Sequence, residues 1–106
     1  MEILTDLAGD QFNITLNEPE KRNAQTPQTW DDLYEICQAV PEEARFIVLR
    51  GNGKSFSAGM DRAMFTPGGI PGQPSFMDMA AQTDTQLDDT IAHYQRFFRV
   101  LRDLPQ

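Results

Sequence analysis

The order of elements along this 106-residue chain predicts an α/β fold: strand, strand, helix, strand, glycine-rich loop, helices. Three observations predict it. Apolar and polar residues alternate near the N-terminus, residues 27–40 carry an amphipathic period near 3.6, and residues 46–49 form a short apolar run. Because an apolar strand that returns after a helix makes a right-handed crossover, we expect it to join the sheet of the first two strands.

Residues 2–17 predict a β-hairpin. Ile3-Leu4 and Phe12–Leu16 are the expected strands, and apolar and polar residues alternate along the second. Ala8-Gly9-Asp10 between them has the composition of a turn. Pro19 and its polar neighbours then end the strand pattern.

A helix is predicted from about Pro27 to Val40, with Thr26 as its N-cap and one apolar face. Pro41 marks its end. The run Phe46–Leu49 is short and rich in branched residues, which predicts a strand covered on both faces.

Glycine and serine then dominate residues 51–59, which predicts a loop. Ligands of such sheets usually bind beyond the carboxyl ends of strands, where this loop falls. Thr66–Pro74 holds three glycines and three prolines, so we expect a flexible surface loop over residues 66–75.

The C-terminal part is predicted to be helical, because apolar residues from Phe76 to Leu101 recur with a period near 3.6. Polar residues 82–86 are expected to divide it into two helices. Phe97 and Phe98 are expected in the core.

Composition limits the classes of function. A net charge of −7 argues against an extended nucleic-acid-binding surface. The single Cys37 excludes an internal disulfide, and the chain shows neither a leader nor an apolar run long enough for a membrane span. We therefore expect a cytoplasmic protein without membrane contact. His93 is the only histidine, which argues against a metal site.

Two known sequence motifs, the phosphate-binding P-loop and the serine nucleophile pattern, match this chain only in part. Gly53-Lys54-Ser55 suggests a phosphate-binding P-loop, but Val48 stands where the first glycine of that motif is required. Ser55 and Ser57 each lack one glycine of the nucleophile pattern Gly-x-Ser-x-Gly.

Two longer stretches, Ile14–Ala24 and Ile47–Asp61, resemble the crotonase (enoyl-CoA hydratase/isomerase) family. The first is similar to that family's strand followed by Leu-Asn-x-Pro-x-x-x-Asn-Ala. The second is similar to its apolar strand, Gly-x-Gly and Phe-(small)-Ala-Gly-x-Asp. One amphipathic helix separates them, as in the family. The resemblance implies the N-terminal portion of a single crotonase-like domain, a ββα spiral that is incomplete over residues 1–106.

The resemblance also implies an acyl-CoA thioester as substrate, with coenzyme A as part of that substrate and no permanently bound cofactor. The family stabilises a thioester oxyanion with two backbone N–H donors, and Met60 would supply one of them. Asp61 is expected to fix the loop or to cap Arg62–Phe65. The residues expected to contact coenzyme A are Lys21, Arg22, Ala24, Ser57, Ala58, Gly59 and Asp61.

In the family a further strand, a second oxyanion donor and two catalytic glutamates follow. Because this chain ends at Gln106, we expect it to lack those groups and to be inactive alone. The apolar stripe from Leu87 to Leu101 is expected to be covered by the complementary part or by another copy in a homo-oligomer.

The resemblance implies hydration of a 2-enoyl-CoA, a lyase reaction of fatty acid metabolism, as the default activity, followed by double-bond isomerisation. Thioester hydrolysis and carbon–carbon bond chemistry stay open. The alternative is a non-catalytic interaction or CoA-binding domain. The loop Thr66–Pro74 is expected to border the acyl pocket.

Overall fold

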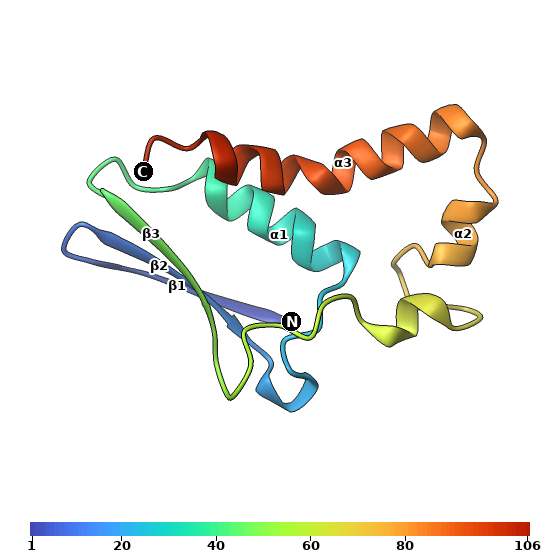
Figure 1. Cartoon of the computed structure of the whole chain (residues 1–106), viewed down its shortest axis with the longest axis horizontal. Helices are drawn as coiled ribbons and strands as arrows, with labels where there is room; N and C mark the ends of the chain where they lie inside the picture. The colour runs from blue at the N-terminus through green and yellow to red at the C-terminus, as the bar shows by residue number, and fades with distance from the viewer.

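The computed structural model describes residues 1–106 as a three-stranded sheet with helices stacked on one of its faces (Figure 1). Strand β1 (Glu2–Ala8) pairs antiparallel with β2 (Gln11–Asn17), and β3 (Phe46–Gly51) pairs parallel with β2. The sheet order is therefore β1-β2-β3. The hairpin and the return of the third strand to the same sheet are confirmed.

The helical elements are η1 (Pro19–Lys21), α1 (Pro27–Gln38), η2 (Arg62–Phe65), α2 (Phe76–Ala80) and α3 (Asp84–Asp103). Helix α1 begins as predicted: the Thr26 hydroxyl accepts from the Thr29 N–H, and the Thr29 hydroxyl accepts from the Thr26 N–H. This capping box satisfies two amides that the helix leaves free. The break between α2 and α3 falls at residues 81–83 and overlaps the start of the polar stretch that predicted it.

The core lies between the sheet and the two longer helices. Helix α1 covers the sheet, and α3 runs along α1 (Figure 1). The buried side chains of the core come from β2, α1, the loop before β3, and α3: Phe12, Ile14, Leu16, Leu33, Cys37, Ala44 and Phe97. Burial of this apolar surface is the main source of stability. None of the helices combines the length and apolar character that crossing a bilayer requires.

Three predictions about this fold were wrong in detail. Strand β3 is not covered on both faces, because the helices stack on only one face of the sheet, and Phe46 is 59% exposed. Phe97 is buried, but Phe98 is 52% exposed because only one of two successive helical positions can face α1. Helix α1 ends at Gln38 rather than Val40.

The predicted apolar stripe of α3 is only partly exposed. Ile91 and Phe98 face solvent, whereas Leu87, Tyr94 and Leu101 are half-buried. Residues 66–75 form turns and coil, as expected of a loop, and their flexibility stays a prediction.

Candidate functional site

Two segments distant in sequence are joined beside the sheet: residues 18–25, here called the turn segment, and residues 51–61, here called the glycine loop. Asn23 joins them with a fully buried side chain. Its Oδ1 accepts from the Glu18 N–H at 2.8 Å. Its Nδ2 lies 2.9–3.1 Å from three carbonyl oxygens of the glycine loop, those of Asn52, Ser55 and Phe56. One amide side chain thus fixes the shape of the loop.

The close approach of the two segments explains Gly51. A Cβ at this position would lie 2.2 Å from the Phe56 carbonyl oxygen and 2.7 Å from Asn23 Nδ2. Arg22 and Asn23 themselves have left-handed backbones, with φ of 51° and 54°. Asparagine tolerates that conformation better than most residues, so the turn suits Asn23 as well as the hydrogen bonds do.

Ser57 and Gln25 hold the second half of the glycine loop. The Ser57 hydroxyl donates to the Asn23 carbonyl oxygen at 2.7 Å and accepts from the Gly59 N–H at 3.1 Å. Gln25 forms a parallel bridge around Met60: its N–H donates to the Gly59 carbonyl oxygen, and its carbonyl oxygen accepts from the Asp61 N–H, both at 2.7 Å.

This bonding leaves one amide of the loop's Ala58–Asp61 stretch free. The Ala58 N–H donates to the Arg22 carbonyl oxygen at 2.8 Å, and the amides of Gly59 and Asp61 are bonded as described. The Met60 N–H has no acceptor within the protein. Gly59, immediately before it, has φ of +89°, a conformation that glycine adopts without strain. The loop therefore presents a fixed and unused hydrogen-bond donor.

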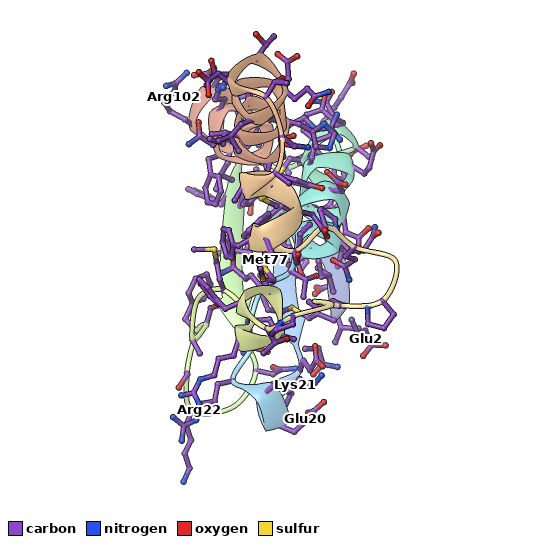
Figure 2. The ribbon with its side chains drawn as sticks, turned by 90° about the vertical axis from the view of Figure 1, so that its right-hand side faces the viewer. Glu2, Glu20, Lys21, Arg22, Met77 and Arg102 are labelled. Carbon is purple, nitrogen blue, oxygen red and sulfur yellow. The ribbon has the colours of Figure 1, made fainter.

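Met60 lines a polar cavity of about 570 Å³ between the two segments. Figure 2 shows Glu20, Lys21 and Arg22 together at η1, with Glu20 and Arg22 extending to opposite sides of this turn. The lining residues are Glu20, Lys21, Arg22, Ala24, Ala58, Met60, Asp61 and Arg62. We call it the Met60 cavity.

Six of the eight residues predicted for the site line this cavity, and two do not. Ser57 and Gly59 do not line the cavity; their hydrogen bonds hold the loop that does. Sequence reasoning missed Arg62, whose position next to Asp61 was its only signal. It also missed the fixing roles of Asn23 and Gln25, although Asn23 belongs to the motif that carried the resemblance.

The charged residues of the cavity differ in what they contact. Lys21 lies 3.7 Å from a carboxylate oxygen of Glu18, whereas Arg22 and Arg62 make no ion pair. Asp61 accepts from the Ala63 N–H at 2.9 Å and caps η2, as predicted. One oxygen of its carboxylate is thus committed to the backbone.

Met60 also lines a second, apolar cavity of about 270 Å³. Its walls come mainly from α2 and α3: Trp30, Met60, Phe76, Met79, Thr90, Ile91, Tyr94, Gln95 and Phe98. Burial, and then the nearby Asp31 carboxylate, raises the pKa of the Tyr94 phenol, so this group is uncharged at neutral pH. Met60 therefore lies between a polar and an apolar cavity.

The loop Thr66–Pro74 does not line the apolar cavity, and its place beside an acyl pocket stays a prediction. Its residues Gly69, Ile70, Pro71 and Gln73 line a different, polar cavity. Helix α2, which follows the loop, supplies Phe76 and Met79 to the apolar cavity. No three His, Cys, Asp or Glu side chains gather closely enough to hold a metal ion.

Comparison with known proteins gives consistent matches. A family model described as enoyl-CoA hydratase/isomerase matches residues 11–91. The mitochondrial Delta(3,5)-Delta(2,4)-dienoyl-CoA isomerase of Mus musculus is 35% identical over 97 residues, which cover 90% of this chain and 29% of that protein. Its Homo sapiens counterpart is 32% identical over the same shares. The chain thus spans 29% of the length of these curated relatives.

Solved structures agree. A Thermobifida fusca YX protein in complex with acetoacetyl-CoA matches with a TM-score of 0.82 and 36% identity, over 94% of this chain and 38% of that one. Enoyl-CoA hydratase from Bacillus anthracis shares the fold, with a TM-score of 0.67 and 21% identity over 100% of this chain and 37% of that one.

Proposed function

Because this chain belongs to the enoyl-CoA hydratase/isomerase family, we propose that the Met60 cavity binds an acyl-CoA thioester and that the Met60 N–H donates to its carbonyl oxygen. The observation that carries the proposal is the free amide of Met60, held by bonded neighbours on both sides. A donor positioned before substrate arrives needs no reorganisation when negative charge develops on the oxygen.

The two cavities that meet at Met60 suit the two halves of such a substrate. The polar cavity, with Arg22, Lys21 and Arg62, would hold the coenzyme A arm, and the apolar cavity would hold the acyl chain. Ala24 and Ala58 have small side chains that leave room for the pantetheine arm. A matched protein that binds acetoacetyl-CoA supports this ligand class.

The reaction we propose for the whole protein is hydration of a 2-enoyl-CoA or migration of its double bond. In both, electron density moves onto the thioester oxygen, where the Met60 amide would stabilise it. Removing one such donor typically costs about 10²–10³ in rate.

A second candidate is a domain that binds acyl-CoA without turnover. It is favoured by the carboxylates that line the Met60 cavity, because they are only Glu20 and Asp61. Asp61 is already bonded to the Ala63 N–H, which leaves one unengaged carboxylate for proton transfer. Loss of the enoyl absorbance of a short 2-enoyl-CoA on addition of the chain would overturn this second candidate.

The donor role is tested with Met60→Pro, which removes this N–H and breaks no hydrogen bond within the protein. We expect Met60→Pro to weaken acetoacetyl-CoA binding about 3- to 10-fold while leaving CoA binding unchanged, because CoA has no thioester carbonyl. Titration calorimetry measures both affinities. Met60→Leu keeps the amide and is the matched control.

Equal losses for both ligands in Met60→Pro would point to a distorted loop rather than a lost donor. In that event, replacing the amide before Met60 by an ester through chemical ligation removes the N–H with less backbone constraint. Unchanged acetoacetyl-CoA affinity in the ester variant would refute the role of Met60.

A further inference from the structure

The side chain of Gln25 links the two cavities that meet at Met60, although Gln25 lines neither of them. Its Oε1 accepts from the Trp30 Nε1–H at 2.9 Å, and its Nε2 donates to the Ser57 hydroxyl oxygen at 2.9 Å. We propose that Gln25 is a positioning residue for acyl-CoA: it holds the Met60 donor and the Trp30 indole in one fixed relation, so that the thioester oxygen and the acyl chain bind together. This inference rests on the proposed function.

On the polar side, Gln25 holds the glycine loop through both its main chain and its side chain. The main-chain bonds to Gly59 and Asp61, both at 2.7 Å, lie on either side of Met60. The side-chain amide adds a third bond, to Ser57, whose hydroxyl then has its one donor and both acceptor positions filled. Three bonds from one residue to the loop therefore fix the direction of the Met60 N–H.

On the apolar side, Gln25 fixes the orientation of Trp30. This indole lies on α1, whereas the other walls of the apolar cavity come from α2, α3 and Met60. Its ring centroid lies 5.5 Å from that of Tyr94, another wall residue. Trp30 is only half-buried, so packing covers part of the ring and the hydrogen bond to Gln25 sets its direction. Without this bond, an acyl chain that packs on the indole would have to order it first, at a cost in conformational entropy.

A positioning role and a purely structural role of this side chain predict different effects on binding. A side chain that only stabilised the loop would affect every ligand alike. Because Gln25 itself lines neither cavity, a loss of affinity that grows with the acyl chain must pass through Trp30. The dependence of the loss on the ligand therefore separates the two roles.

Gln25→Met tests the inference on the 106-residue chain. It removes both side-chain hydrogen bonds, keeps a side chain of similar length and leaves the main-chain bridge around Met60. Titration calorimetry compares CoA, which lacks the thioester carbonyl, with acetyl-CoA and octanoyl-CoA. We expect unchanged CoA affinity, a loss of about 2-fold for acetyl-CoA and a loss of about 5- to 20-fold for octanoyl-CoA.

Gln28→Met is the matched control. The exposed side chain of Gln28 donates to Asp32 within α1 and lines neither cavity at Met60, so we expect all three affinities to stay unchanged. Equal losses for the three ligands in Gln25→Met, or octanoyl-CoA binding equal to that of Gln28→Met, would overturn the inference and leave the proposed function standing. Absence of thioester binding by the unmodified chain would overturn both.

Trp30→Phe breaks the same hydrogen bond from its other partner and keeps an aromatic ring in the wall. If this bond carries the effect, the octanoyl-CoA loss of the double variant is smaller than the product of the two single losses, by about 3-fold or more. Independent losses, which multiply, would overturn the route through Trp30.

The fluorescence of Trp30, the only tryptophan of the chain, tests the contact without any ligand. We expect lower fluorescence anisotropy in Gln25→Met than in Gln28→Met, because the indole loses the bond that orients it. Equal anisotropy in the two variants would show that Gln25 does not fix the indole, and the inference would fail whatever the ligands do.

Discussion

The two cavities that meet at Met60 are built by different forces. On the polar side, directional hydrogen bonds from one buried side chain, Asn23, fix a loop that contains almost no regular structure. On the apolar side, packing of α2 and α3 shapes the wall, and several wall residues are half exposed. Chemistry that needs an amide fixed in position is served by the first kind of construction. A packed apolar wall suits a ligand group whose length varies.

The difference predicts unequal sensitivity to substitution. We call Asn23, which holds the glycine loop through its hydrogen bonds, a hub. A hub is disrupted when a single hydrogen-bonding group is lost, because each buried group left without a partner costs free energy of folding. In a packed wall whose residues are partly exposed, each substitution changes stability only slightly. The three substitutions that follow test this contrast, from the largest expected effect to the smallest.

Asn23→Ala should have the largest effect. It removes four hydrogen bonds at a fully buried position, so we expect the free energy of unfolding to fall by about 2–4 kcal/mol. Urea unfolding measures this loss. Asn17→Ala is the control, because its side chain bonds Glu2 and Asn52 at the surface, and we expect a change within about 1 kcal/mol.

If Asn23→Ala lost no more unfolding free energy than the control, Asn23 would not be the hub of the glycine loop. The same variant should also lose measurable CoA affinity, since the Met60 cavity depends on the shape of the glycine loop. Intact CoA binding in a destabilised Asn23→Ala chain would separate loop shape from ligand binding.

Phe98→Ser addresses the apolar side and should have an intermediate effect. Phe98 is 52% exposed, so we expect folding stability to change by about 1 kcal/mol or less. We expect the affinity gained by lengthening the acyl group from acetyl to octanoyl to fall about 3- to 10-fold, because Phe98 lines the apolar cavity.

Phe46→Ser is the matched control for Phe98→Ser. Phe46 is 59% exposed and lies at the start of β3, outside the apolar cavity. Competition titrations with the two thioesters measure the chain-length effect in each variant. An equal response to acyl length in both variants would mean that the acyl group binds elsewhere.

The polar side was the more predictable from sequence, and the reason is local. The donor Met60 and the small residues Ala58 and Gly59 act through their own backbone, so a contiguous motif contains the information. The hub Asn23 was not predicted to act as it does. Its three carbonyl partners in the glycine loop lie 29–33 residues away along the chain. Residue spacing alone does not predict which distant carbonyl groups a side chain will contact.

The apolar side was predicted less well for a different reason. Periodicity identified α3 as amphipathic but could not decide its rotation about its axis, so Phe97 and Phe98 were both expected in the core. Packing against α1 makes that choice. The exposure of β3 likewise depends on which face of the sheet the helices cover, which its composition does not encode.

Asp31→Asn should have the smallest effect. Its carboxylate Oδ1 lies 2.8 Å from His93 Nε2 and 3.5 Å from an Arg96 guanidinium nitrogen, so it joins α1 to α3 through a hydrogen bond to the His93 ring and an ion pair with Arg96. The three side chains are 33–44% exposed, and exposed ion pairs contribute only about 0.2–1 kcal/mol. We expect a loss in that range that shrinks at high salt.

Asp32→Asn is the control, because Asp32 accepts from Gln28 within α1 and does not reach α3. Urea unfolding at two salt concentrations compares the variants. If Asp31→Asn cost about 3 kcal/mol or more, the ion cluster rather than the packing of Phe97 would position α3. The apolar cavity would then depend on a hub as the polar side does, and the contrast between the two sides of Met60 would not hold.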